Sequence, residues 1–174
     1  MRGEARRQEN IPMASNSSVL SLKEAQAILS QEDTGCLCLC KGNQPYAVPV
    51  SYAYLDGEIL IHSSPEGKKL DVIRENHQAC FVVSRNPDRT KPHQAQDGCS
   101  FRYESVLCFG TARLVDEPGE RLAKLKAFKD YFYKRLKLDP QKDPVTEKAA
   151  EHAACVVITI KEITGKKKEP KRKG

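Results

Sequence analysis

One short segment, 62–69 (HSSPEGKK), carries side chains suited to binding an anion. Ser64 is a good N-cap and Pro65 a good first helical residue, so the segment predicts a helix over 65–76. Two lysines follow at the start of this helix, where the helix dipole already places partial positive charge. The pattern therefore predicts that something anionic binds at the helix entrance.

A phosphate group would fit this entrance. Its oxygens would accept hydrogen bonds from the first backbone N–H groups and from the Ser63 and Ser64 hydroxyls, and its charge would offset Lys68 and Lys69. A second interpretation needs no ligand, because long lysine side chains can extend into water and bind nothing. His62 ends the preceding predicted strand, where an imidazole could bond to a ligand, ligate a metal such as haem iron, or only close the strand.

Cys36, Cys38 and Cys40 alternate along another predicted strand, which suggests a metal site at first sight. On a strand, however, side chains of one face are spaced by ~7 Å, whereas two sulfurs on one zinc ion lie no more than ~4.6 Å apart. We therefore expect structural thiols and no metal. Cys99 lacks a CxxC partner, and no Gly-rich nucleotide loop, G-x-S-x-G elbow or H-E-x-x-H pattern is present, so any chemistry is expected to come from a cofactor.

The 174 residues, 39% apolar and 30% charged, fit one globular domain. No apolar run approaches the ~20 residues of a membrane-spanning helix. No apolar stretch follows the arginines near the N-terminus, so we expect a cytoplasmic protein without an export signal. Its seven cysteines are then expected to be reduced.

The net charge of +6 is concentrated in 166–173, which hold six lysines and arginines against one glutamate. We expect a flexible arm over 1–18, a folded domain over 19–165 and a basic tail over 166–174. No aromatic residue interleaves with the tail lysines, which argues against a single-strand nucleic-acid site. Binding of nucleic acid or an acidic partner by the tail is one hypothesis for function.

Six strands and three short helices are predicted without regular alternation. Ser21 and Glu24 form a capping-box pattern before the first helix, Asp56-Gly57 predicts a tight hairpin, and Gly110 predicts a bulge or a close backbone approach. The predicted strands cover 36–40, 46–54, 58–63, 79–83, 101–115 and 155–160. This order favours a mainly β fold, a small antiparallel barrel with helices at its ends, over a doubly wound parallel sheet.

Several motifs occur in an order that resembles a known family. They are PYAVPVSY at 45–52, DG at 56–57, HSSPEGKKL at 62–70, CF at 80–81, YESVLCFG at 103–110 and ITGK at 163–166. The chain resembles the pyridoxamine 5'-phosphate oxidase-like FMN-binding split barrels, most closely the nitroimidazole-resistance (Nim-type) subgroup, over about 20–168. The resemblance implies a six-stranded antiparallel split barrel that forms a homodimer, with FMN in clefts at the subunit interface.

The resemblance also implies roles for single residues. Lys68 and Lys69 would bind the FMN phosphate, with help from Ser63 and Ser64, and His62 would lie beside the flavin. Ser105 would reach FMN from the other subunit. The backbone that would run along the polar edge of the isoalloxazine ring belongs to Val48, Pro49, Val50 and Ser51.

The expected function is an FMN-dependent oxidoreductase that takes electrons from NADH or NADPH and reduces a small nitro compound or quinone. No catalytic acid or base is assigned, and His62 is the candidate for tuning the flavin or orienting a substrate. The C-terminal tryptophan and arginine of true pyridoxamine-phosphate oxidases are missing, so oxidation of vitamin B6 is not expected. The alternative is a non-enzymatic flavin or haem-binding split barrel, with His62 as an axial ligand. The segment 85–100 would shape the substrate side of the flavin or be disordered.

Overall fold

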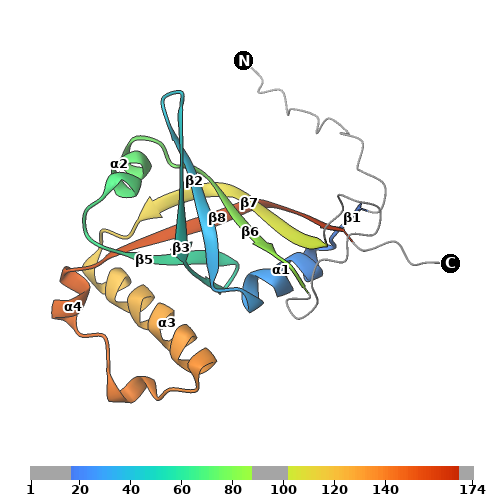
Figure 1. Ribbon diagram of the computed structural model, residues 1–174. Helices are drawn as coiled ribbons and strands as arrows, with labels where there is room; N and C mark the ends of the chain where they lie inside the picture. The colour runs from blue at the N-terminus through green and yellow to red at the C-terminus, as the bar shows by residue number, and fades with distance from the viewer. Residues whose placement is uncertain (1–16, 88–101, 169–174) are drawn as a thin grey trace.

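The computed structural model describes residues 17–87 and 102–168. Within these ranges eight strands form one curled antiparallel sheet in the order β3-β2-β6-β7-β8-β5-β4, with β1 beside β8 (Figure 1). The strands are β1 Ser17–Val19, β2 Thr34–Lys41, β3 Gln44–Ser51, β4 Ala53–Leu55, β5 Glu58–Ser63, β6 Gln78–Arg85, β7 Tyr103–Leu114 and β8 Ala154–Lys168. The helices are α1 Leu22–Gln31, α2 Lys68–Glu75, α3 Pro118–Leu136 and α4 Glu147–Glu151, and Pro140–Lys142 form a 3-10 turn, η1. The predicted mainly β barrel with flanking helices is confirmed.

The described strands exceed the six predicted because of long-range pairing. Residues 46–54 do not form one strand: the Tyr52 ring turns into the core, where its hydroxyl donates to the Leu29 carbonyl at 2.9 Å, and the chain divides into β3 and β4. Strand β8 continues past 160 because β7 supplies partners up to Lys168, opposite Tyr103. Three lysines of the expected tail therefore belong to the sheet, where they pair with β1, which includes Ser17 and Ser18 of the expected arm. Residues 1–16 and 169–174 lie outside the described residues.

Two local predictions from glycine are confirmed. Asp56 and Gly57 both have positive φ, 51° and 80°, as a two-residue hairpin between β4 and β5 requires. At Gly110 the register of β7 against β8 shifts, and a Cβ atom there would lie 2.1 Å from the Thr159 carbonyl oxygen. The bulge and the close backbone approach thus occur together.

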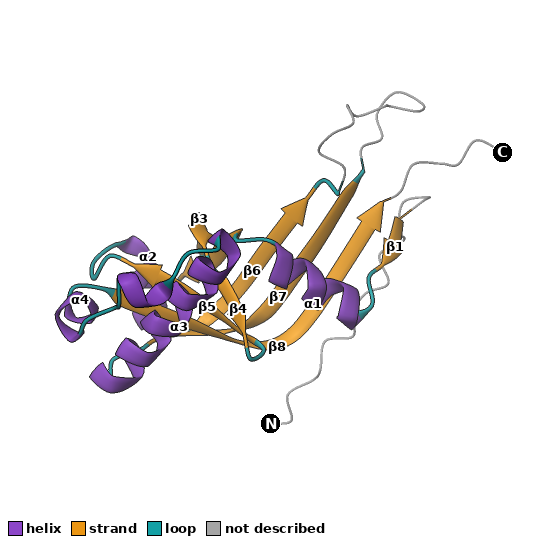
Figure 2. Cartoon of the chain, turned by 90° about the horizontal axis from the view of Figure 1, so that it is seen from below, coloured by secondary structure: helices purple, strands orange, loops and turns teal. Residues whose placement is uncertain are grey.

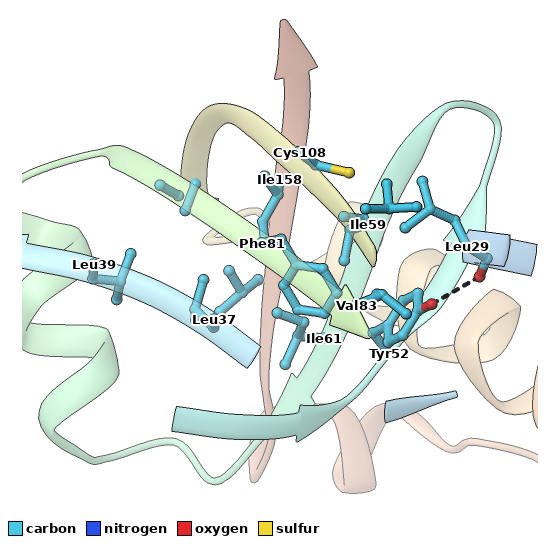
Figure 3. Packing of buried hydrophobic residues seen from close by; sticks show 14 of the residues in the cluster. Leu29, Leu37, Leu39, Tyr52, Ile59, Ile61, Phe81, Val83, Cys108 and Ile158 are labelled. Atoms are coloured by element: carbon cyan, nitrogen blue, oxygen red, sulfur yellow. Dashed lines mark hydrogen bonds between the residues drawn. The ribbon is translucent and has the colours of Figure 1, made fainter. Parts of the chain in front are cut away.

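Two apolar clusters hold the fold together. The larger one fills the barrel under α1 and α2 and includes Leu29, Tyr52 and Phe81; the Tyr52 and Phe81 rings meet edge to face, 4.8 Å between centroids (Figure 3). The smaller one lies between the sheet and α3 and α4, and includes Leu60 and Leu125. Figure 2 shows α3 and α4 gathered at one end of the sheet, while β6, β7 and β8 extend beyond them.

Helix α1 has both ends satisfied by side chains. The predicted capping box is confirmed: the Ser21 hydroxyl accepts from the Glu24 N–H, and the Glu24 carboxylate accepts from the Ser21 N–H at 2.8 Å. At the other end, the carbonyls of the last turn accept from side chains of distant elements, namely Tyr52, Tyr131 and Arg135. No described helix is long and apolar enough to cross a membrane.

Candidate functional site

The entrance of α2 differs from the prediction in its first residue. The helix begins at Lys68, and its N-cap is Gly67, with φ 140°, so the predicted cap Ser64 and first residue Pro65 lie in the preceding loop. Glycine adopts this φ without strain, which allows the chain to turn into the helix later than the Ser-Pro pair suggests. Among the residues that the structure describes, no side chain caps the helix. Its first N–H groups therefore lack a side-chain acceptor.

The two predicted lysines occupy the first two helical positions. Lys68 is exposed, with its ammonium 5.1 Å from the centre of the Tyr46 ring of β3, and Lys69 is half-buried. Within the described ranges neither lysine forms an ion pair with a carboxylate; Asp71, in the same turn, pairs instead with Arg74 at 3.0 Å. The positive charge of this helix entrance is therefore uncompensated by the described residues.

Ser63 supplies a third unsatisfied group. It is the last residue of β5, it is 6% exposed, and its hydroxyl has no hydrogen-bond partner among the described residues. A buried hydroxyl without a partner costs about 1–3 kcal/mol. Ser64 follows it in the exposed loop. An acceptor bound at this entrance, such as a phosphate oxygen, would satisfy the hydroxyl, so the residues present fit an anionic group.

His62 faces the opposite side of β5. Side chains alternate along the strand, so Ile61 and Ser63 turn into the barrel, whereas Leu60 and His62 turn toward α3. The His62 ring lies 6.0 Å from that of Phe128. Partial burial and the nearby Lys69 ammonium lower the pKa of His62, so the imidazole is mainly neutral at pH 7. Within the described ranges neither of its nitrogens has a hydrogen-bond partner.

Among the described strands, β3 ends the sheet on one side, so its outward backbone groups have no neighbouring strand in the described part of the chain. The Tyr52 N–H donates to the Asp33 carbonyl at 3.0 Å. Because every second residue of an antiparallel strand bonds to the same neighbour, the main-chain groups of Val50 and Val48 also bond to β2. The groups on the open edge belong to Ala47, Pro49 and Ser51. Within the predicted stretch 48–51, Pro49 and Ser51 therefore direct main-chain groups to the open edge, whereas Val48 and Val50 have half-buried side chains.

Ser105 does not join this site within one chain. It lies on β7, opposite Ser84 of β6, and strands β6 and β2 separate it from β3. It shares its face of the sheet with half-buried apolar side chains and with the 40% exposed Phe109. We name this surface the outer face; its members are Cys36, Cys38, Cys80, Val82, Ser105, Leu107 and Phe109.

The alternating cysteines lie on this outer face, but their spacing differs from the prediction. The sulfurs of Cys36 and Cys38 lie 3.9 Å apart, because the two side chains lean toward each other. Burial, with Cys36 and Cys80 close by, raises the pKa of the Cys38 thiol to about 11. Cys40 points to the Gly42 carbonyl instead. Among the described residues no three His, Cys, Asp or Glu side chains are arranged to hold a metal ion; Cys99 lies outside them.

The sequence family model for pyridoxamine 5'-phosphate oxidase matches residues 21–167. The chain belongs to this family. Among curated proteins, an uncharacterised protein of Rhizobium meliloti is 36% identical over 66 residues, which are 38% of this chain and 43% of that relative. The chain therefore matches less than half the length of this relative.

Several solved structures have the same fold as this chain. A FAD-binding protein from Mesorhizobium loti is 24% identical, with a TM-score of 0.64, and the match covers 88% of this chain and 99% of that one. A putative 5-nitroimidazole antibiotic resistance protein from Bacteroides thetaiotaomicron is 20% identical, with a TM-score of 0.71 and coverage of 94% and 95%. A FAD and haem binding protein from Mycobacterium smegmatis is 20% identical, with a TM-score of 0.72 and coverage of 92% and 77%.

Proposed function

We propose that the protein binds FMN at the entrance of α2 and along the open edge of β3, and acts as a flavin-dependent oxidoreductase. The observation that carries the proposal is the buried Ser63 hydroxyl without a described partner. It lies five residues before the start of a helix that no described side chain caps and that opens with two lysines outside any described ion pair. A phosphate satisfies all three features at once. The names of similar structures, which include FAD-binding proteins, support a flavin as the group that carries the phosphate.

Each part of the site has a distinct role in this proposal. Lys68 and Lys69 neutralise the phosphate, while Ser63 and Ser64 donate hydroxyl hydrogen bonds to its oxygens. The position of Tyr46 against Lys68 joins the phosphate site to β3. The open main-chain groups of Pro49 and Ser51 then bond to the polar rim of the ring system. When bound, FMN supplies hydride and electron transfer from NADH or NADPH to a small acceptor of the nitro or quinone type.

The outer face supports a homodimer as the functional unit. Its half-buried apolar side chains form a continuous surface over β2, β6 and β7, and Ser105 lies at its margin. Pairing of two outer faces would bury Leu107 and Phe109 and bring Ser105 toward the β3 edge of the partner. Apolar surface of this kind on a sheet marks an interaction site in many proteins.

The test of FMN binding is the spectrum and flavin content of the purified protein, together with a double variant, Lys68→Ala with Lys69→Ala. Loss of two charge-assisted contacts is expected to weaken FMN binding about a hundredfold or more. The matched control removes two exposed lysines elsewhere, Lys23→Ala with Lys126→Ala, and should retain FMN. Equal FMN affinity in the two double variants would contradict the phosphate assignment.

The dimer has its own test. Phe109→Lys places a charge on the outer face and is expected to shift the protein from dimer to monomer in light scattering, with loss of FMN. The control, Leu136→Lys, changes a 64% exposed leucine at the end of α3 and should leave both properties unchanged. A Phe109→Lys monomer that binds FMN as tightly as the unchanged protein would exclude an interfacial flavin site.

A haem-binding barrel is the second candidate function. The observation that favours it is His62, whose nitrogens have no described hydrogen-bond partner, beside the aromatic rings of α3. A haem bound through His62 would give a Soret band near the blue edge of the visible spectrum that is lost in His62→Ala. A flavin spectrum without this band favours the first proposal.

A further inference from the structure

The side of β5 that faces α3 contains a cavity separate from the entrance of α2. It has a volume of about 340 Å³ and lies between β5, α3, α4 and the segment 143–145. Its apolar walls are formed by Leu125, Phe128, Phe132, Val145, Ala149 and Ala153. In Figure 1, α3 and α4 lie below β5. The volume is within the range of about 300–1,000 Å³ typical of small-molecule sites.

The aromatic side chains give this cavity a preference for a flat ring. The Phe128 and Phe132 rings lie 4.8 Å apart, tilted by 43°, and the His62 ring lies beyond Phe128 at 6.0 Å and 45°. Rings inclined to one another in this way can contact a further ring by its edge or its face. An aliphatic ligand would fill the same volume without these contacts.

The polar groups of the cavity are of two kinds. At one side Lys129 contacts Asp143, and the Tyr133 hydroxyl donates to the Asp143 carboxylate at 2.9 Å, so these three groups satisfy one another. His62 has no such partner among the described residues. The Lys69 ammonium adds positive potential to this wall, as its effect on His62 indicates. A negatively charged group that accepts a hydrogen bond from the one N–H of the neutral imidazole suits this wall.

We infer that this cavity is a second binding site, for a small monocyclic aromatic carboxylate, with the ring between Phe128, Phe132 and Val145 and the carboxylate on His62. The site is distinct from the proposed flavin site, because His62 and Ser63 point to opposite faces of β5. Of the described residues the two sites share only Lys69, and the cavity itself is formed without FMN.

The test uses 4-fluorobenzoate and its neutral analogue 4-fluorotoluene as probes in ¹⁹F NMR titrations of the purified full chain, without flavin and with saturating FMN. Ala149→Leu fills the cavity with a larger side chain at an exposed position of α4, and should weaken both probes at least about tenfold. Ala123→Leu adds the same atoms to an exposed position of α3 outside the cavity and should weaken neither.

His62→Phe separates charge recognition from ring recognition. It keeps a ring at the wall but removes the hydrogen-bond donor, so it should weaken 4-fluorobenzoate about tenfold and leave 4-fluorotoluene unchanged. Unchanged circular dichroism in each variant shows that the fold is intact. Equal binding of 4-fluorobenzoate to the Ala149→Leu and Ala123→Leu variants would overturn the inference, as would its displacement by FMN or its failure to bind the unchanged protein.

Discussion

Helices α1 and α2 begin in opposite ways. At α1, Ser21 and Glu24 satisfy the first N–H groups from within the chain. At α2, Gly67 offers no side chain, and the first residues add positive charge to the positive end of the helix dipole. The capping side chains thus belong to α1, which packs on the barrel core, whereas the entrance of α2 has none among the described residues. This difference is expected where a ligand binds at α2.

The two regions should therefore respond differently to the same type of substitution. Changes around α1 should alter the free energy of unfolding and leave ligand binding unchanged. Changes at the entrance of α2 should alter ligand binding and leave the stability of the ligand-free protein nearly unchanged.

Tyr52→Phe should have the largest effect on stability. The Tyr52 hydroxyl is buried and donates to the Leu29 carbonyl in the last turn of α1 at 2.9 Å, as the dashed line in Figure 3 shows. Phenylalanine keeps the ring and leaves that carbonyl without its donor, at a cost of about 1–3 kcal/mol. Urea unfolding at fixed temperature measures the loss. FMN affinity should not change, and a variant of unaltered stability would show that the hydroxyl is not needed there.

Ser63→Ala should show the opposite pattern. In the ligand-free protein it removes a buried hydroxyl that has no described partner, so the free energy of unfolding should stay equal or increase. FMN affinity, followed by flavin fluorescence, should fall about tenfold because one hydrogen bond to the phosphate is lost. Ser21→Ala is the matched control: the same change at the α1 cap should lower stability by about 1 kcal/mol without affecting FMN. A loss of stability in Ser63→Ala would contradict this prediction, because it would show that the hydroxyl stabilises the ligand-free protein.

The features that were predictable from sequence are those set by neighbouring residues. The capping box at Ser21, the hairpin at Asp56-Gly57 and the irregularity at Gly110 all follow from local conformational preferences. The entrance of α2 was predicted with the right lysines but the wrong first residue. Sequence preferences favour Ser64 as the N-cap because its hydroxyl can accept a hydrogen bond from the helix. The chain instead enters the helix at Gly67, whose φ of 140° is open to glycine and which makes no side-chain hydrogen bond.

The remaining features depend on distant parts of the chain. The extension of β8 to Lys168 requires β7 beside it, and the division at Tyr52 requires the Leu29 carbonyl. The cavity beside His62 was missed entirely, since it forms only where α3, α4 and β5 meet. Phe128 and Phe132 are four residues apart, as on one side of a helix, but such periodicity does not distinguish a packed face from a cavity wall.

The smallest predicted effect concerns the pH dependence of the α1 cap. Contacts with Lys167 and Ser21 lower the pKa of Glu24 from its ordinary value of 4.5 to about 2. Because the folded-state pKa lies below the unfolded one, the ionised Glu24 stabilises the fold above pH 4.5, and this contribution is lost as the pH falls toward 2. Glu24→Gln should therefore be less stable than the unchanged protein at pH 7, and the difference should shrink through that window. At the entrance of α2 no carboxylate pairs with the lysines in the described ranges, so that helix has no matching charge contact. A constant difference for Glu24→Gln from pH 7 to pH 2 would show that its charge does not contribute to the cap.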